Sequence, residues 1–326
     1  MAIEANTHQT YATKGIREDL KDIITRITPT EFPFMSMIGS ESVSNSLVEW
    51  QTQALRAPAV NAQVEGDVFT PSARTATAKL SNYTQTLTAA ISVSGTNEAV
   101  KAAGRASEIG YQVSLAALEL KGDMEAALCS SANGVAGAAS NATVSATHAG
   151  GAGAARFLRG MEGWLADNVD LGATGVAPVY TTGAWTAPVD GTPRALTEAM
   201  FLNVSQKSYD AGGNPDTAIL SSKQRLALNA FNGGATKFLS MSDNELHNTF
   251  DVYVSPFGKY KLVTSRIVRN SVIPIIDRSK WKMGVLRPYQ AIDLPKSHDA
   301  TRKALLTEVT LFCLAPNSSG AVKALS

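Results

Sequence analysis

The chain has 326 residues, a formal net charge of +1 and only 17% charged residues. Its length allows a large core, and its nearly balanced charge excludes a global electrostatic attraction to nucleic acid or to an anionic membrane. Because a typical soluble domain has roughly 25% charged residues, much of this surface is either polar and uncharged or covered by partners.

Cysteine usage and the lack of long apolar runs bear on the compartment. Cys129 and Cys313 are the only cysteines, which excludes a disulfide framework and a cysteine-rich zinc site and fits a reducing compartment. The first residues have no apolar run typical of a signal peptide, and no window is long and apolar enough to span a membrane. We therefore expect a soluble protein made inside a cell, with no membrane partner.

The first 40 residues have the pattern of an arm. After a polar start, residues 16–27 place isoleucines and a leucine on one helical face, and Pro29 ends this predicted helix. The apolar segment that follows contains Phe32, Phe34 and Met35. Such a segment docks either on the core of its own subunit or on the core of a neighbour.

Residues 46–55 and 82–95 alternate in polarity and are predicted to be two antiparallel strands of an extended hairpin. The sequence between them has turn formers and few large apolar residues, so the hairpin cannot bury a core of its own. A hairpin of that length needs another surface on which to lie. This is the first indication of an assembly protein.

The longest predicted element is a helix that begins after Ser107 and ends near residue 131. Its apolar residues recur at spacings of three and four, Ser107 is suited to cap its first turn, and Gly104 separates it from a short helix at 97–103. We interpret it as a spine. The Ala/Gly-rich tract at 132–155 follows it, with the pattern of a loop.

The second half predicts an α+β module at about 195–275. A helix is expected to begin at Thr192-Pro193 and to end at Gly212-Gly213, and Ser221 is predicted to cap another. A short helix around Trp164 precedes this module. The strands are predicted at 216–220, 250–255, 259–265, 273–277, 281–287, 291–294 and 305–314.

The sequence offers no active site. The four histidines are scattered, and no metal, nucleophile or phosphate-binding motif occurs, so we expect no enzyme activity, no cofactor and no metal. A basic run, opposed locally only by Asp277, is interpreted as solvated strand edges, or else as a subunit contact or a face toward packaged nucleic acid. It consists of Lys259, Lys261, Arg266, Arg269, Arg278, Lys280, Lys282 and Arg287.

Taken nearly end to end, the chain resembles the major capsid proteins of tailed bacteriophages with the Hong Kong 97-like fold. No single segment carries this resemblance; the order and spacing of many segments do. They include TYATKGIREDLKDIITRITPTEFPFMSMIG, LVEWQT, NAQVEGD, LSNYTQ, VSGTNEAV, LKGDMEAAL, GMEGWLADN, ALTEAM, YDAGGNPD, FDVYVSPFGKYKLVTSR, VLRP and LLTEVTLFCLAPN.

The resemblance implies an α+β fold with an N-terminal arm (1–40), an extended loop (41–95), a peripheral domain with the spine helix (96–194 and 276–326) and an axial domain (195–275). It implies an icosahedral shell of hexamers and pentamers that encloses double-stranded DNA, held non-specifically, in the virion of a phage made in the bacterial cytoplasm. A scaffolding protein, a portal and a decoration protein are the further partners implied. Lys79 is the one lysine of the loop, but the motif for a cross-link to asparagine is missing.

On this interpretation, contacts between subunits are expected from the loop and the arm. The candidate residues are Trp50, Glu65, Asp67, Arg74 and Lys79 in the loop, and Phe32, Phe34 and Met35 in the arm. For each of them, packing within its own subunit is the alternative. Alternatives for the whole chain are an encapsulin-type compartment shell, an α+β enzyme without recognisable motifs, and a surface adhesin, which the missing export signal disfavours.

Overall fold

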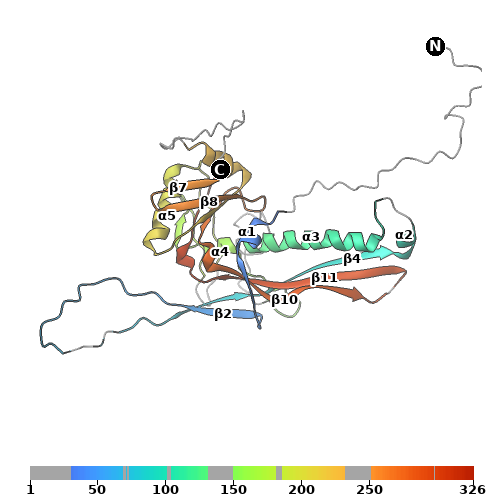
Figure 1. Cartoon of the computed structure of the whole chain (residues 1–326), viewed down its shortest axis with the longest axis horizontal. Coiled ribbons are helices and arrows are strands. Elements are labelled where there is room, and N and C mark those ends of the chain that lie inside the picture. Colours follow the sequence, from blue (N-terminus) through green and yellow to red (C-terminus); the bar gives the residue numbers. More distant parts are fainter. Residues whose placement is uncertain are drawn as a thin grey trace, which may run out of the picture.

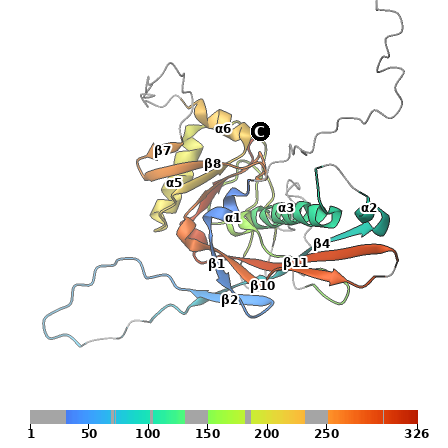
Figure 2. The same cartoon turned by 45° about the vertical axis from the view of Figure 1, so that its right-hand side comes forward.

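We describe the fold from a computed structural model. The described residues are 31–68, 71, 73–100, 104–130, 150–180, 186–231, 251–296 and 298–326. The predicted arm helix at 16–27 and most of the 132–155 tract lie outside them. The described chain has a compact unit, a long sheet with a helix along it, and a loop that projects away from both (Figures 1 and 2).

The long part of the molecule is a four-stranded sheet in the order β1-β10-β11-β4. Strand β1 runs parallel to β10, whereas the other neighbours are antiparallel. The bounds are β1 Gly39–Ser42, β4 Gln85–Ser94, β10 Trp281–Leu294 and β11 Ala300–Cys313. The hairpin of β10 and β11 joins the predicted separate strands 281–287 and 291–294 into one, with register shifts near Arg287.

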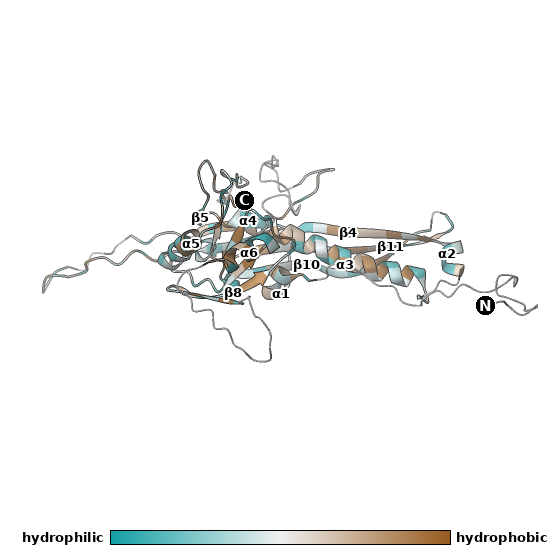
Figure 3. Cartoon of the chain, turned by 90° about the horizontal axis from the view of Figure 1, so that it is seen from above, coloured by the Kyte–Doolittle hydropathy of each residue, from teal (hydrophilic) through white to brown (hydrophobic). Residues whose placement is uncertain are grey.

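The spine helix α3 (Glu108–Cys129) lies along this sheet (Figure 1). Ser107 caps it as predicted, because its Oγ accepts the Gly110 N–H at 3.2 Å. Ala116 and Leu120 pack on Leu305 of β11, and hydrophobic residues recur along α3 in Figure 3. The leading helix α2 is short, at Gly95–Ala99. The predicted spine and its apolar face are confirmed.

The compact unit contains a six-stranded sheet in the order β5-β12-β9-β6-β8-β7, with helices α5 and α6. The strands are β5 Asn168–Asp170, β6 Thr217–Leu220, β7 Val252–Ser255, β8 Gly258–Thr264, β9 Ile273–Ile276 and β12 Gly320–Val322. The helices are α5 Glu198–Asp210 and α6 Ser222–Asn229, with short 3-10 turns at Arg278–Lys280 and Pro316–Ser318. Phe201, Leu220 and Ile275 belong to its buried core.

Helix α5 begins later than predicted. Thr197, not Thr192-Pro193, precedes its first turn, because Arg194 is held in a β-bridge to Leu325. Its predicted end is confirmed: Gly212 has φ +83°, and its N–H bonds to the Tyr209 carbonyl. Ser221 caps α6 as expected, accepting the Gln224 N–H at 3.4 Å.

The six-stranded sheet also extends beyond the predicted module at 195–275. Strands β5 and β12 lie outside that range, yet β12 pairs with β9 on one side and with β5 on the other. Ala321 and Val322 are fully buried there. The final residues of the chain, which the predicted domain division places with the spine helix, therefore pair into the six-stranded sheet, and Ala321 also packs in the same core cluster as Leu128 of the spine helix.

The third sheet is the hairpin of β2 (Leu47–Thr52) and β3 (Ala78–Tyr83). The predicted second strand, 82–95, is thus wrong in its pairing: residues 85–94 form β4 and pair with β11. Thr84 marks the change, because its N–H still bonds to the Ser46 carbonyl on the β2 side, whereas Gln85 already pairs with Val309. The polar–apolar alternation of 85–94 fits either sheet, so only tertiary packing decides between them.

The three sheets meet in one junction core. Helices α1 (Pro33–Met37) and α4 (Met161–Trp164) lie there beside the C-terminal half of α3. Trp164 and Trp281 are buried in it, and both cysteines lie in the same cluster. Burial raises the pKa of the Cys129 and Cys313 thiols well above the usual range, which makes both of them unreactive.

Candidate assembly surfaces

The extended loop has no core of its own. Between β2 and β3 the described residues contain no helix or strand, and all of them are exposed. Its apolar side chains are almost fully in water: Leu55 is 96% exposed, Val60 97%, Val64 78% and Val68 81%. Large apolar side chains left in water on a projecting segment indicate a surface that a partner covers.

The loop carries four of the predicted contact residues. Glu65, Asp67 and Arg74 are exposed on it, so they remain available to a neighbour. Lys79 lies at its base and forms an ion pair with Glu49 across the hairpin, at 2.6 Å. Both side chains of this pair are partly exposed, so it contributes little to stability.

Trp50 anchors the base of the loop on its own subunit. Its indole N–H donates to the Cys313 carbonyl at 3.0 Å, and its ring lies 5.3 Å from Trp164 and 5.2 Å from Phe312 between centroids. Trp50 thus packs within its own subunit and fixes the point from which the loop projects. Because its side chain is only half-buried, its contact with another subunit stays a prediction.

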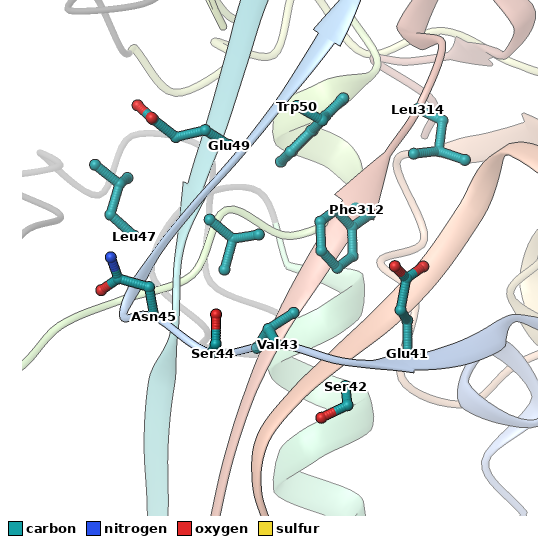
Figure 4. A pocket seen from close by; sticks show the side chains of 11 residues that line it. Glu41, Ser42, Val43, Ser44, Asn45, Leu47, Glu49, Trp50, Phe312 and Leu314 are labelled. Atoms are coloured by element: carbon teal, nitrogen blue, oxygen red, sulfur yellow. The ribbon is translucent and has the colours of Figure 1, made fainter.

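An open groove of about 490 Å³ lies beside this anchor, between residues 41–50 and the end of β11. Trp50, Phe312 and Leu314 line it, together with Val43 (Figure 4). Its two carboxylates already have partners, since Glu41 pairs with Lys282 at 2.9 Å and Glu49 with Lys79. The groove thus has a lining of mixed polarity, and neither of its carboxylates is without a partner.

The arm segment docks on the spine helix of its own subunit. The N–H groups of Phe34 and Met35 donate to the two carboxylate oxygens of Glu125, each at 2.7 Å. They are the first two N–H groups of α1, and no carbonyl within the helix can accept their hydrogen bonds. The Glu125 carboxylate is their acceptor instead. Burial raises the pKa of Glu125, and the two amide hydrogen bonds oppose that shift.

For Phe34 the predicted contact between subunits is therefore wrong. The side chain is 0% exposed and packs edge-on against Trp281, with centroids 6.0 Å apart. Met35 is half-buried against the same core, and the ring of Phe32 lies over Gly122 of α3. The sequence did not identify Glu125 as the acceptor for this segment, although a carboxylate beside the apolar stripe of a helix needs a hydrogen-bond partner when it is buried.

A buried cluster of charged residues connects the C-terminal segment to the junction core. Arg269 bonds to Glu162 at 2.6 Å and to Asp190 at 2.7 Å. The fully buried Lys323 ammonium donates to the carbonyls of Glu162 and Leu165 at 3.3 and 2.9 Å. Burial lowers the pKa of Lys323 to about 8. Burial also acts to lower the pKa of Arg269, but Glu162 and Asp190 outweigh it and raise that pKa.

The basic run divides into two groups in space. Arg269, Arg278, Lys282 and Arg287 pair with acids that are distant in sequence: Glu162, Asp216, Glu41 and Glu308. Lys259, Lys261, Arg266 and Lys280 are exposed and form no ion pair with a described acid. For the second group, a contact with another subunit or with packaged nucleic acid stays a prediction.

The described residues show neither a metal site nor a helix that could span a membrane. Among these residues, no group of three or more His, Cys, Asp or Glu side chains is placed to hold a metal ion. None of the helices in the described ranges is long and apolar enough to cross a membrane.

The comparisons with known proteins agree with one another. The SU10 major capsid protein family matches residues 4–326. The major capsid protein of Escherichia phage Phieco32 is 26% identical over 336 residues, covering 95% of this chain and 94% of that protein.

Solved structures give the same fold. The capsid asymmetric unit of cyanophage A-1(L) has a TM-score of 0.63 at 12% identity, covering 97% of this chain and 98% of that one. A chain from Microbacterium phage Oxtober96 has a TM-score of 0.61 at 12% identity and covers 95% of each. The capsid of a native GTA particle has 0.61 at 11% identity, covering 97% of each. At such identities the likeness establishes the fold, which is Hong Kong 97-like.

The family match spans nearly the whole chain and decides between the interpretations that the sequence left open. It favours the phage capsid over a compartment shell, and it agrees with a loop and an arm that build no core of their own. The chain belongs to the SU10 major capsid protein family and is a phage major capsid protein with the Hong Kong 97-like fold.

Proposed function

We propose that this major capsid protein closes into an icosahedral head shell of hexamers and pentamers in which each subunit lays its extended loop on a neighbour. The observation that carries the proposal is the loop itself, whose apolar residues Leu55, Val60 and Val64 are between 78% and 97% exposed on an isolated subunit. A protein gains nothing from presenting such residues to water unless a second surface receives them.

The energetics suit reversible assembly. Burying one such side chain contributes about 1.5–3 kcal/mol, and part of that is offset by ordering the loop. Each contact is therefore weak, but a subunit in a closed shell makes several at once, and point-group symmetry repeats them. Wrongly placed subunits can leave during growth, whereas a completed shell is stable.

The remaining partners of the shell are also proposals. The contact with packaged double-stranded DNA would be non-specific, and the exposed Lys259, Lys261, Arg266 and Lys280 are candidates for it. A scaffolding protein would guide closure, a portal would occupy one vertex, and a decoration protein would bind the outer face. We propose a purely structural role, without a catalytic step, for a chain made in the cytoplasm of the host bacterium and carried in the virion.

The test is to replace residues 56–74 by a short Gly-Ser linker. We expect a subunit with wild-type helix content and thermal midpoint that forms no shells when observed by negative-stain electron microscopy. As a matched control, Glu119→Gln removes a charge from an exposed position of α3 outside the loop and should assemble like the wild type. The double variant Glu65→Gln, Asp67→Asn keeps the loop and tests the charges of two contact candidates separately from its apolar residues. A deletion variant that unfolds would place the loop in the core of its own subunit, and one that still forms closed shells would remove the loop from assembly; either result contradicts the proposal.

A further inference from the structure

Strand β4 is an edge of the four-stranded sheet, and its outer side is open. It pairs with β11 on one side, and among the described residues no strand pairs with the other side. The Gly95 N–H points to the Asp299 carbonyl of the β11 side, and the Thr84 N–H points outward to Ser46. Because backbone groups alternate in direction along a strand, the N–H and C=O groups of even-numbered residues face outward. Thr86, Thr88, Ala90 and Ser92 thus present four outward-facing backbone positions with which no described residue pairs.

This edge lacks the features that normally prevent strand addition. Proteins protect exposed edges with charged side chains, proline, bulges or very short strands. Strand β4 has ten residues, QTLTAAISVS, with neither a charge nor a proline. Its pairing with β11 runs from Gln85 to Ser94 without a register shift. An open, regular and uncharged edge of this length is a template for an added strand.

The side chains of β4 also alternate between the two faces of the sheet. Leu87, Ala89 and Ile91 are half-buried toward α3, where they pack beside Leu120. The even-numbered residues are polar or small and lie exposed on the opposite face. A strand added to this edge should therefore be apolar on the α3 side and polar on the other.

One segment of the extended loop has this pattern. Residues 60–64 read Val-Asn-Ala-Gln-Val, so Val60 and Val64 share one face and Asn61 lies on the other. The segment is uncharged, lies fully exposed and has no strand partner among the described residues. Flanked by Ala59, it supplies six residues without proline, one fewer than the seven from Thr86 to Ser92.

A subunit cannot make this pairing with itself. The loop and β4 both start at the base of the β2–β3 hairpin, but they extend toward opposite ends of the molecule (Figures 1 and 2). The occupant must then come from another chain. The proposed function places the loop of a second copy on each subunit, and this inference rests on that placement.

We propose that residues 59–64 of one subunit add as a fifth strand to the outer edge of β4 in a neighbouring subunit. The main-chain groups of Thr86, Thr88, Ala90 and Ser92 bond to the added strand, while Val60 and Val64 extend the apolar surface beside Leu87 and Ile91. Backbone hydrogen bonds supply the affinity, and the match of apolar and polar faces fixes which side of the added strand meets α3.

The first test uses cross-linking between two mixed populations. One carries Ala90→Cys and the other Asn61→Cys, both on the face away from α3, and a bismaleimide of about 8 Å reach tolerates the diagonal neighbour positions of paired strands. Cys129 and Cys313 are buried, which limits the background. We expect a covalent dimer only when both populations are mixed and assembled. Ser40→Cys on the opposite sheet edge replaces Ala90→Cys as the matched control and should give at least tenfold less dimer.

The second test uses Thr88→Pro. Proline removes an outward N–H that takes no part in the ladder with β11, and edge strands tolerate it there. We expect a folded subunit that needs about a tenfold higher concentration to assemble. Each contact loses one hydrogen bond, and a loss of about 1.4 kcal/mol corresponds to a factor of ten in affinity. Thr88→Val keeps the N–H and should assemble like the wild type.

The outcomes separate this inference from the proposed function. Wild-type shells without the Ala90–Asn61 link, or shells of Thr88→Pro at the wild-type concentration, overturn the strand addition and leave the shell role intact. If the wild type forms no shells at all, the proposed function fails and this inference fails with it.

Discussion

The buried ammonium of Lys323 makes the stability of the subunit depend on pH in a calculable way. The side chain is 0% exposed, and burial lowers its pKa from 10.5 to about 8. Between these two values the unfolded chain holds a proton that the folded chain has released, so the free energy of unfolding rises with pH. Below about pH 8 both states are protonated, and the full cost of the buried charge remains.

The magnitude follows from the shift. The complete effect is about 3 kcal/mol, since each unit of pKa corresponds to about 1.4 kcal/mol. Integrating over protonation between pH 7 and pH 10 gives about 2–3 kcal/mol, most of the total. Arg269 stays charged throughout, because its pKa is raised above the ordinary value. Burial likewise raises the pKa values of Tyr180 and Tyr253, which destabilises the fold as pH rises above 10.

The assay compares the wild type with Lys323→Met, so that the tyrosine contribution cancels. Urea unfolding of unassembled subunits, followed by the fluorescence of the buried Trp164 and Trp281, gives the free energy at pH 7, 8.5 and 10. We expect the wild type to gain about 2–3 kcal/mol relative to Lys323→Met across this range. Lys280→Met, at an exposed position, should behave like the wild type. A difference that is flat from pH 7 to 10, or that falls, would refute the reasoning.

Three further predictions concern packing. Glu125→Leu should leave the first two N–H groups of α1 without an acceptor, at a cost of at least about 2 kcal/mol. The hydrogen exchange of these two amides should therefore accelerate about 30-fold or more. Glu119→Gln, at an exposed position of α3, should leave their exchange unchanged. Leu120→Asp, at a side chain 1% exposed, should yield insoluble protein, because an unpaired buried charge costs several kcal/mol; soluble shells would contradict this. Gly320→Ala places a Cβ 2.3 Å from the Asn168 carbonyl oxygen, and a thermal midpoint unchanged within error would disprove the expected loss of about 1–3 kcal/mol.

Elements with a strong local signal could be predicted from the sequence. The spine has a capping serine, a three-and-four apolar repeat and a glycine before it, and these place α3 almost residue for residue. Gly212 marks the end of α5 for a similar reason, since a left-handed turn there favours glycine. The extended loop was recognisable by what it lacks, because a long segment with few large apolar residues cannot bury itself.

Pairing across the chain could not be predicted. Residues 85–94 alternate in a way that suits the loop hairpin and the long sheet equally, and the choice depends on the space between α3 and β11. Strand β12 is too short to show a pattern, yet it completes the six-stranded sheet.

Charge partners were hidden by sequence separation. Arg269 pairs with Glu162, which lies 107 residues earlier in the chain. From the sequence alone, fewer charges of the basic run therefore appeared to be neutralised than the structure shows. Among the contact candidates, Phe34 lies in the first turn of the short helix α1, and Trp50 lies within the short strand β2. Whether such a residue packs inward or outward depends on neighbours such as Trp281 and Cys313 that the local sequence does not reveal.

The most direct measurement is cryo-electron microscopy of the particles formed when the full chain is expressed with phage head genes, resolved far enough to trace residues 53–77. The account predicts closed icosahedral shells of hexamers and pentamers in which this segment crosses onto an adjacent subunit. Shells in which the segment folds back on its own subunit, or a protein that stays monomeric with the head genes present, would contradict it.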